Sequence, residues 1–263
     1  MRPMTYGRDG RLGLRTWHGD GGNIVCFPCA GGDSLSFRSF AAALPDWYQV
    51  TALDLPGHGG APGFPVTSLD RLVQLSTAAL VRRPVPVAVL GHSFGAYLAV
   101  ESVRRLGALD SRWRDVRVIL CSARAPAVAT TLPSPALADD ALAAELVGLG
   151  GIPQELVGSP LMAQFLPRIR ADLTAARSYV ADARRQHRPP LDNRTLVITG
   201  AADPLCDPRL AGAWREVVTN PDAVVIQAGH YVPQTAPAVL AQTVDGWLST
   251  TDALPDAHVF LGA

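Results

Sequence analysis

Short runs of apolar residues alternate along the chain with longer stretches in which apolar positions recur at helical spacing. The stretch at 68–81, for example, places Leu69, Leu72 and Val73 on one face of a helix. Such alternation is typical of a parallel sheet whose strands are joined by crossover helices. The predicted strands are 23–27, 49–53, 85–90, 116–121, 195–199 and 223–227, and the predicted helices are 34–44, 68–81, 94–106, 208–218 and 237–248.

The alternation stops between residues 124 and 190, where no apolar run predicts a strand. A segment of this length inside an α/β pattern is expected to have a purpose of its own. We therefore predict an α/β core, formed by residues 1–123 and 191–263, with a mostly parallel central sheet flanked by helices. Residues 124–190 form a predicted helical insertion over one end of that sheet. The helices expected in it are 137–147, 154–157 and 161–183.

The strongest chemical signal is the sequence G-H-S-F-G at residues 91–95, which directly follows a predicted strand and leads into a predicted helix. This is the context of a nucleophile elbow, a sharp turn that lifts a serine hydroxyl, here that of Ser93, out of the sheet. Residues two before and two after that serine must be very small, and Gly91 and Gly95 meet the requirement. The alternative is a glycine-rich turn whose serine only caps the helix.

A serine nucleophile needs a base, and the base needs a carboxylate that orients it. In this architecture the partners follow the serine in the order acid, then histidine, each just after a later strand. Asp203 follows the predicted strand 195–199, and His230 follows the predicted strand 223–227. Because the carboxyl ends of parallel strands meet at one edge of the sheet, we predict a triad of Ser93, Asp203 and His230.

The other candidate acids and histidines have simpler explanations. Asp207 is expected to cap a helix, and Asp172, in the helical insertion, is expected to be solvated or paired. His92 lies inside the elbow and is expected to pack facing away from the serine hydroxyl. His58 follows a strand at the same rim of the sheet, so that a contact between His58 and substrate stays open. The histidines expected at the surface are His18, His187 and His258.

Attack on a carbonyl group creates a negatively charged oxygen, which needs fixed N–H donors. The backbone N–H of Phe94 is one predicted donor, because it follows the nucleophile at the start of a helix, where the helix dipole favours negative charge. The loop at residues 27–32, F-P-C-A-G-G, is expected to supply the second, which we assign to the N–H of Ala30. The alternative for Gly31 and Gly32 is an ordinary turn.

Composition narrows the possible classes of protein. Hydrophobic residues make up 48% and charged residues 17% of the 263 positions, which argues against a disordered or coiled-coil chain. The 23 basic and 23 acidic residues cancel, whereas nucleic-acid-binding proteins usually have a basic face. Neither a secretion signal nor an apolar run of about 18 residues is found, so we expect a cytoplasmic protein that does not act at a membrane. The balanced charge is compatible with a monomer.

Cofactor-binding motifs are missing from the sequence. Cys26 and Cys29 form the pattern C-F-P-C, but Cys26 ends an apolar strand, whereas redox pairs of this kind normally open a helix. No pair of cysteines or histidines has the spacing of a metal site, and neither H-E-x-x-H, G-x-G-x-x-G nor a phosphate-binding loop is present. We therefore expect no metal and no redox cofactor.

Several motifs together resemble the type II thioesterases of polyketide and nonribosomal peptide assembly lines. The resemblance extends from about residue 22 to residue 248 and includes a segment of the helical insertion. The motifs that carry it are F-P-C-A-G-G at 27–32, L-P-G-H-G at 55–59, G-H-S-F-G at 91–95, L-P-R-I-R-A-D at 166–172, G-A-A-D-P at 200–204 and G-H at 229–230.

The resemblance implies an α/β-hydrolase fold with a helical lid. It implies hydrolysis of acyl groups from the phosphopantetheine arm of an acyl or peptidyl carrier protein, so that the pantetheine belongs to the partner. It matches Ser93, Asp203 and His230 to the triad of the family, and Ala30 and Phe94 to its oxyanion donors.

The sequence departs from the family pattern at four positions. The family more often has Met at Phe94, Tyr at Cys29, Arg at His58 and an acidic residue near Arg177. The first change keeps the backbone N–H, whereas the change at Arg177 concerns the packing of the lid and the preferred chain length. An ordinary carboxylesterase has the same nucleophile and stays the main alternative, and a ligand receptor on a hydrolase fold is a further one.

Overall fold

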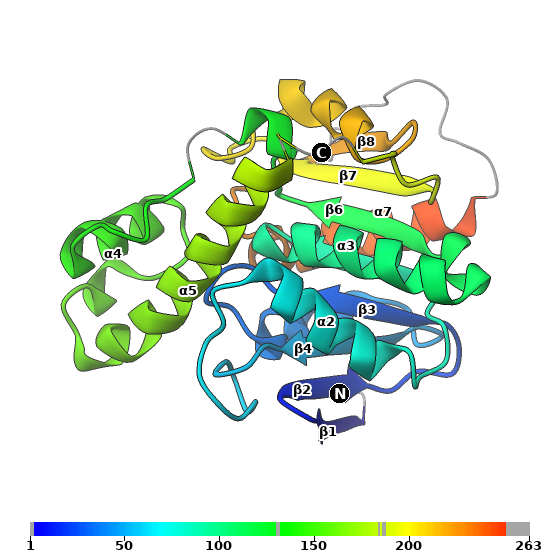
Figure 1. Cartoon of the computed structure of the whole chain (residues 1–263), viewed down its shortest axis with the longest axis horizontal. Helices are drawn as coiled ribbons and strands as arrows, with labels where there is room; N and C mark the ends of the chain where they lie inside the picture. Colours follow the sequence, from blue (N-terminus) through cyan, green and yellow to red (C-terminus); the bar gives the residue numbers. More distant parts are fainter. Residues whose placement is uncertain (1–2, 130–131, 184, 186–187, 251–263) are drawn as a thin grey trace.

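The computed structural model describes residues 3–129, 132–183, 185 and 188–250. In these ranges eight strands form one sheet, in the order β1-β2-β4-β3-β5-β6-β7-β8 (Figure 1). The strands β3 to β8 are parallel to one another, whereas β1 and β2 pair antiparallel. The strands are β1 Met4–Asp9, β2 Leu12–Trp17, β3 Asn23–Phe27, β4 Gln49–Asp54, β5 Ala88–His92, β6 Arg117–Cys121, β7 Thr195–Gly200 and β8 Asp222–Ile226.

Helices cover both faces of the sheet, as expected for parallel strands that are buried on each side (Figure 1). Helices α2 and α3 lie on one face, and α1 and α7 lie on the other. The α-helices are α1 Arg38–Ala43, α2 Leu69–Leu80, α3 Phe94–Leu109, α4 Asp139–Gly148, α5 Pro160–Ala183, α6 Val232–Thr235 and α7 Pro237–Ser249. The 3₁₀ turns are Ser34–Phe37, Ser111–Arg114, Pro126–Val128, Gln154–Leu156 and Pro208–Glu216.

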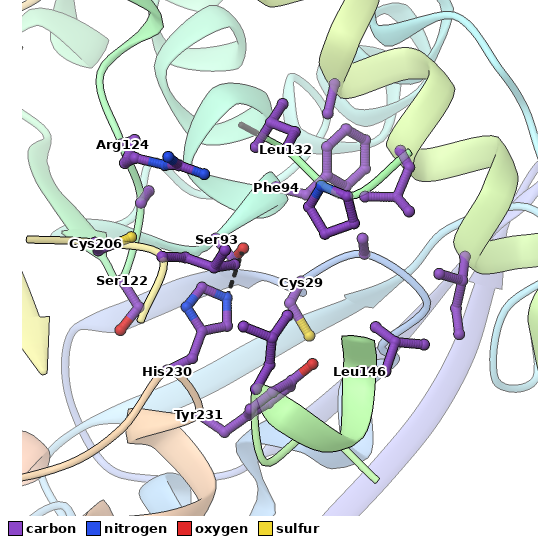
Figure 2. A pocket seen from close by; sticks show the side chains of 18 of the residues that line it. Cys29, Ser93, Phe94, Ser122, Arg124, Leu132, Leu146, Cys206, His230 and Tyr231 are labelled. Atoms are coloured by element: carbon purple, nitrogen blue, oxygen red, sulfur yellow. Dashed lines mark hydrogen bonds between the residues drawn. The ribbon is translucent and has the colours of Figure 1, made fainter. Parts of the chain in front are cut away.

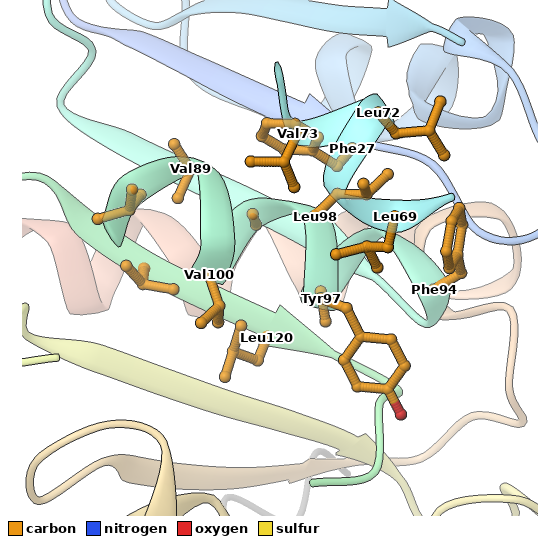
Figure 3. Close-up of a cluster of buried hydrophobic side chains, with 14 of the residues drawn as sticks. Phe27, Leu69, Leu72, Val73, Val89, Phe94, Tyr97, Leu98, Val100 and Leu120 are labelled. Carbon is orange, nitrogen blue, oxygen red and sulfur yellow. The ribbon is translucent and has the colours of Figure 1, made fainter. Parts of the chain in front are cut away.

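The larger core lies between the sheet and the pair α2 and α3. Leu72 and Val73 of α2 lie beside Phe27 of β3, and Leu98 of α3 joins them in the same cluster of buried side chains (Figure 3). Helix α2 begins where the sequence predicts, because the side chain of Ser68 accepts a hydrogen bond from the N–H of Arg71 and caps the first turn. Buried apolar contacts therefore hold β3 and α3, the elements beside the elbow, against α2.

Three predicted helices are tighter than expected: the short one at 154–157 is the 3₁₀ turn Gln154–Leu156, and the other two lie in the α/β core. The segment 34–44 starts with a 3₁₀ turn and becomes α-helical only from Arg38, and the segment 208–218 is a 3₁₀ helix from Pro208 to Glu216. Each begins at an aspartate whose carboxylate accepts a hydrogen bond from the N–H two residues on, Asp33 from Leu35 and Asp207 from Arg209. The predicted capping role of Asp207 is therefore confirmed.

The hairpin of β1 and β2 is an element that the sequence analysis missed, since the first predicted strand begins at residue 23. Strand β1, M-T-Y-G-R-D, has largely exposed side chains and therefore lacks an apolar period. The two residues between the strands, Gly10 and Arg11, follow Asp9, and Asp-Gly at such a position is a hairpin signal. This hairpin adds an antiparallel edge to an otherwise parallel sheet.

Between residues 124 and 190, all regular structure in the described ranges is helical. Helix α5 connects two environments: Ala175, Ala176 and Val180 join the larger core, whereas its first half packs against α4 away from the sheet (Figure 1). The residues of α4 and α5 that form this separate apolar cluster are Leu142, Ala143, Leu146, Met162, Leu166, Ile169 and Leu173. No helix in the described residues has the length and apolar character that crossing a membrane requires.

We predict that Leu98→Ala lowers the free energy of unfolding by about 2–5 kcal/mol, because it removes buried methyl groups and leaves a cavity. Leu98 is fully buried, whereas Leu109, at the end of the same helix, is 69% exposed. Leu109→Ala is therefore the matched control and should change stability by less than about 0.5 kcal/mol. Urea unfolding measures both, and equal losses would contradict this account of the core.

Candidate active site

Ser93 occupies the turn between β5 and α3 in a backbone conformation that is rare for a residue with a side chain, with φ 54° and ψ −116°. Its N–H donates a hydrogen bond to the carbonyl oxygen of Cys121 on the neighbouring strand β6, at 2.8 Å. The hydroxyl makes no capping hydrogen bond to the helix. The alternative interpretation, a serine that only caps the helix, is therefore wrong, and its side chain is free to point at the pocket.

The two glycines of the elbow are required by close approach of the backbone. A Cβ at Gly91 would overlap the backbone of Ala96, and a Cβ at Gly95 would overlap the carbonyl oxygens of Phe27 and Pro28. Helix α3 can therefore start directly against the end of β3. The same contact brings Ser93 next to the loop that follows β3.

The structure brings Ser93, His230 and Asp203 into one chain of hydrogen bonds. The Nε2 atom of His230 lies 3.0 Å from the hydroxyl oxygen of Ser93, and its Nδ1 atom lies 2.9 Å from Oδ2 of Asp203 (Figure 2 shows the first contact). Asp203 follows β7 and His230 follows β8, as the sequence predicts. Because a carboxylate only accepts, the ring proton lies on Nδ1, and the lone pair of Nε2 faces the serine.

Asp203 is held in its ionised form. Burial would raise the pKa of its carboxyl, but the hydrogen bond and charge of His230, together with the N–H groups of Leu205 and Cys206, outweigh burial and lower the pKa. Those two N–H groups both donate to Oδ1, at 2.8 and 3.1 Å, so that Oδ2 is left to His230. This carboxylate can both orient the imidazole and stabilise it when it becomes protonated.

His92 supports His230 from behind. Its Nε2 donates a hydrogen bond to the backbone carbonyl oxygen of His230 at 2.9 Å. Burial and the neighbouring His230 lower the pKa of His92 to about 3, so this ring is neutral at physiological pH. The expectation that His92 faces away from the serine is confirmed, but the sequence analysis missed that it fixes the backbone of His230.

Ala30 and Phe94 line the same pocket as Ser93. Within the described ranges, the backbone N–H of neither residue donates a hydrogen bond to another protein group. The N–H of Phe94 also lies at the first turn of α3, whose dipole favours negative charge. Both predicted donors therefore lie beside the serine and have their N–H groups available. We call residues 28–32, which contain Ala30, the oxyanion loop.

The pocket beside Ser93 is apolar and is closed by the helical insertion. Phe94 and Leu132 lie on one side of the serine, and Tyr231 and Leu146 lie on the other (Figure 2). A second cavity adjoins the first, since both are lined by Cys29, Ala30, Leu146, Ile169 and Tyr231. The residues that the insertion contributes to the first pocket are Arg124, Leu132, Pro133, Leu146, Leu149, Ile169, Leu173 and Ala176.

Three further residues from the sequence analysis, His58, Asp172 and Arg177, do not line this pocket. His58 does not line either of the two cavities and is almost fully buried. It pairs with Asp172, which is also buried, so the expectation that Asp172 is solvated or paired is confirmed as a pair. Arg177, where the family differs, donates a hydrogen bond to the carbonyl oxygen of Leu132 in the pocket wall.

The remaining histidines and cysteines have other surroundings. His18 is exposed, as expected, and His187 and His258 lie outside the described residues. Cys26 lies on β3 and Cys29 in the oxyanion loop; burial raises the pKa of both thiols, that of Cys29 to about 12, which disfavours the reactive thiolate.

One group of possible metal ligands occurs in the described part of the chain, formed by Asp203, Cys206 and His230. Both oxygens of Asp203 and both ring nitrogens of His230 already make the hydrogen bonds given above. Burial also raises the pKa of the Cys206 thiol, which disfavours the thiolate that a metal would need. These residues fit a hydrogen-bonded acid and base better than a metal site.

Comparison with known proteins gives one matching family model, described as a thioesterase domain, over residues 23–248. A probable cadicidin biosynthesis thioesterase of Streptomyces griseus is 30% identical over 226 residues, which cover 83% of this chain and 61% of that protein. The match therefore spans less than two thirds of the length of that relative.

Solved structures with this fold include two described as biosynthetic thioesterases. RedJ, a thioesterase of the prodiginine pathway in Streptomyces coelicolor, is 29% identical with a TM-score of 0.73, and the match covers 86% of this chain and 84% of RedJ. YbtT, a type II thioesterase of the yersiniabactin NRPS/PKS pathway, is 28% identical with a TM-score of 0.73, and the match covers 86% of this chain and 92% of YbtT. The predicted α/β-hydrolase architecture, with a mostly parallel sheet, is thereby confirmed.

We predict that Gly95→Ala lowers the free energy of unfolding by about 1–3 kcal/mol, because its Cβ overlaps the backbone at the end of β3. It should also slow labelling of Ser93 by a fluorophosphonate probe, followed by mass spectrometry. Gly246→Ala in α7 is the matched control, since open space surrounds that position and alanine favours a helix. Unchanged stability and labelling in Gly95→Ala would show that the elbow does not need this close approach.

Proposed function

The chain belongs to the thioesterase family, and from this premise we propose that it is a type II thioesterase of polyketide or nonribosomal peptide biosynthesis. In this proposal it hydrolyses acyl groups from the phosphopantetheine arm of an acyl or peptidyl carrier protein. The observation that carries the proposal is the chain of hydrogen bonds from Ser93 through His230 to Asp203, beside an apolar pocket under the helical insertion.

The first half of the reaction transfers the acyl group to the enzyme. His230 accepts the proton of the Ser93 hydroxyl on Nε2 as the oxygen attacks the thioester carbonyl carbon, which forms a C–O bond. Asp203 stabilises the resulting imidazolium. The C–S bond then breaks, and the pantetheine sulfur leaves as a thiol with the proton from His230. The product of this half is an ester of Ser93.

The second half releases the acid by the same groups. Water attacks the carbonyl carbon of the acyl-serine and gives its proton to Nε2 of His230. The C–O bond to Ser93 breaks, and the serine oxygen recovers that proton. In both halves the negative charge on the carbonyl oxygen is stabilised by the N–H groups of Ala30 and Phe94, which are available beside the serine.

Two features support a carrier-bound acyl thioester as substrate. The pocket beside Ser93 is largely apolar and suits the acyl group, and the adjoining cavity between the oxyanion loop and α5 leaves room for a pantetheine arm. The relatives RedJ and YbtT are described as thioesterases of biosynthetic pathways. In this mechanism the pantetheine belongs to the carrier protein, and no metal or redox group takes part.

We predict that Ser93→Ala keeps the fold but lowers kcat for an acyl-carrier thioester by about 10⁴-fold or more, because no other group can form the acyl ester. Intact mass spectrometry of the acylated carrier protein, before and after incubation, measures the loss of the acyl group directly. Ser111→Ala is the control, because Ser111 is exposed and does not line the pocket. Undiminished hydrolysis by Ser93→Ala would remove the serine mechanism.

A carboxylesterase would have the same triad, so the substrate comparison is a separate test. We expect a larger kcat/KM for an acyl group on a carrier protein than for the same acyl group on a simple alcohol. The reason is that the pantetheine arm contributes binding energy that the alcohol lacks. Preference for the simple ester would favour the carboxylesterase alternative instead.

A further inference from the structure

Asp172 connects the helical insertion to the oxyanion loop. It lies on α5, and its side chain is fully buried. One of its oxygens, Oδ2, accepts two hydrogen bonds, from the N–H of Gly31 at 2.8 Å and from Nε2 of His58 at 3.0 Å. The other oxygen, Oδ1, is buried and has no hydrogen-bond partner in the described residues. A buried carboxylate with so few donors depends strongly on each of them.

The contact with Gly31 bears directly on the reaction, because Gly31 follows Ala30. The backbone of Gly31 has a positive φ of 72°, and a Cβ there would overlap the side chain of Ile169, one turn before Asp172 on α5. Helix α5 therefore holds the oxyanion loop by a hydrogen bond and by a close apolar contact. The peptide between Ala30 and Gly31 cannot turn without disturbing at least one of them.

The surroundings of His58 favour its doubly protonated ring. Its Nδ1 atom lies 3.0 Å from the carbonyl oxygen of Pro56, and its Nε2 atom lies 3.0 Å from the carboxylate of Asp172. A carbonyl oxygen accepts and does not donate, and neutral imidazole has one N–H only. With Asp172 ionised, the contacts with Pro56 and Asp172 are therefore both hydrogen bonds only when His58 is an imidazolium.

The groups around His58 together raise its pKa, although they do not all act in the same direction. Burial would lower the pKa of His58, but the hydrogen bond and charge of Asp172, with the carbonyl of Pro56, outweigh burial and raise it. Arg168, on the same helix as Asp172, opposes this increase through its charge, and its guanidinium group lies over the ring of Phe165. From the strand that precedes His58, the buried Asp54 accepts the N–H of Gly60 in the same loop. From the oxyanion loop, Cys29 lies near Asp172, and burial raises the pKa of its thiol.

We propose that His58 and Asp172 are positioning residues whose ion pair holds the oxyanion loop in its catalytic geometry, so that loss of the His58 proton slows turnover. The imidazolium fixes the carboxylate of Asp172, and the carboxylate fixes the N–H of Gly31. The Ala30–Gly31 peptide is thereby held, which restrains the adjoining Cys29–Ala30 peptide, whose N–H is the proposed oxyanion donor. Neither side chain lines the cavities described above, so the effect passes through the loop. The inference rests on the proposed thioesterase function.

The sign of the pH effect follows from the raised pKa of His58. The ion pair is complete at pH values below that pKa and is lost as the pH rises through it. Turnover should therefore fall on the alkaline side, with a decrease in kcat and little change in KM, because the loop stabilises charge in the transition state and not the bound substrate.

The direct test compares the pH profiles of the wild type, His58→Gln and His18→Gln on an acyl thioester of pantetheine. Gln keeps an N–H group near Asp172 but does not titrate. His18→Gln is the matched control, because it makes the same substitution at an exposed histidine. We expect the pH profile of His58→Gln to lack the alkaline decrease. At low pH, kcat of this variant should be at least about tenfold below that of the wild type. This loss is smaller than the ~10²–10³-fold loss of kcat on removing an oxyanion donor. His18→Gln should match the wild type. An unchanged alkaline decrease in His58→Gln would overturn the inference.

A second variant and a structural readout cover the case in which His58→Gln does not fold. Asp172→Asn removes the charge that raises the pKa of His58, so the alkaline decrease should move to lower pH, and an unmoved decrease would contradict the inference. In the wild type, the amide signal of Gly31 in an ¹⁵N–¹H NMR titration should shift with the midpoint of the His58 ring. If the Gly31 signal does not shift at the pH midpoint of the His58 ring, the coupling between His58 and the oxyanion loop is refuted, whether or not the protein hydrolyses thioesters. Absence of hydrolysis in the wild type, with the NMR link intact, would instead refute the proposed function.

Discussion

The geometry of the site depends on one constraint, the close approach of α3 to the end of β3 at the nucleophile turn. Glycines at 91 and 95 allow that approach. Ser93 has a left-handed backbone conformation, which is held by the hydrogen bond from its N–H to the carbonyl oxygen of Cys121 and by the packed strands on either side. Strain of this kind persists only where the surrounding structure enforces it. The same approach places the start of α3 against the oxyanion loop.

The remaining groups reach the serine through the order of the strands. β7 and β8 lie on one side of β5 and deliver Asp203 and His230, whereas β3 lies on the other side and delivers the oxyanion loop. The helical insertion closes this edge, and α5 contacts the oxyanion loop through Ile169 and Asp172. The sheet therefore supplies the reactive groups, and the insertion supplies the pocket wall and holds the loop.

The sequence predicts those site residues whose role depends only on a short local motif or on their position directly after a strand. Ser93 with its glycines, and single polar residues after the strands β7 and β8, could be identified without tertiary information. The pair His58 and Asp172 could not, because the two residues are 114 positions apart and meet only through the packing of α5 on the sheet. The hairpin of β1 and β2 was missed because β1 is exposed and lacks an apolar period, so its pairing with β2 rather than burial defines it.

Direct observation of the acylated enzyme tests the central claim most directly. An acyl-carrier thioester is mixed with the enzyme, quenched with acid within milliseconds to seconds, and the enzyme is digested and analysed by mass spectrometry. The account predicts one acyl group per enzyme, located on the peptide that contains Ser93, which appears before the free acid and decays as the acid forms. Hydrolysis that proceeds with no acyl group on Ser93, or with the acyl group on another side chain, would contradict it.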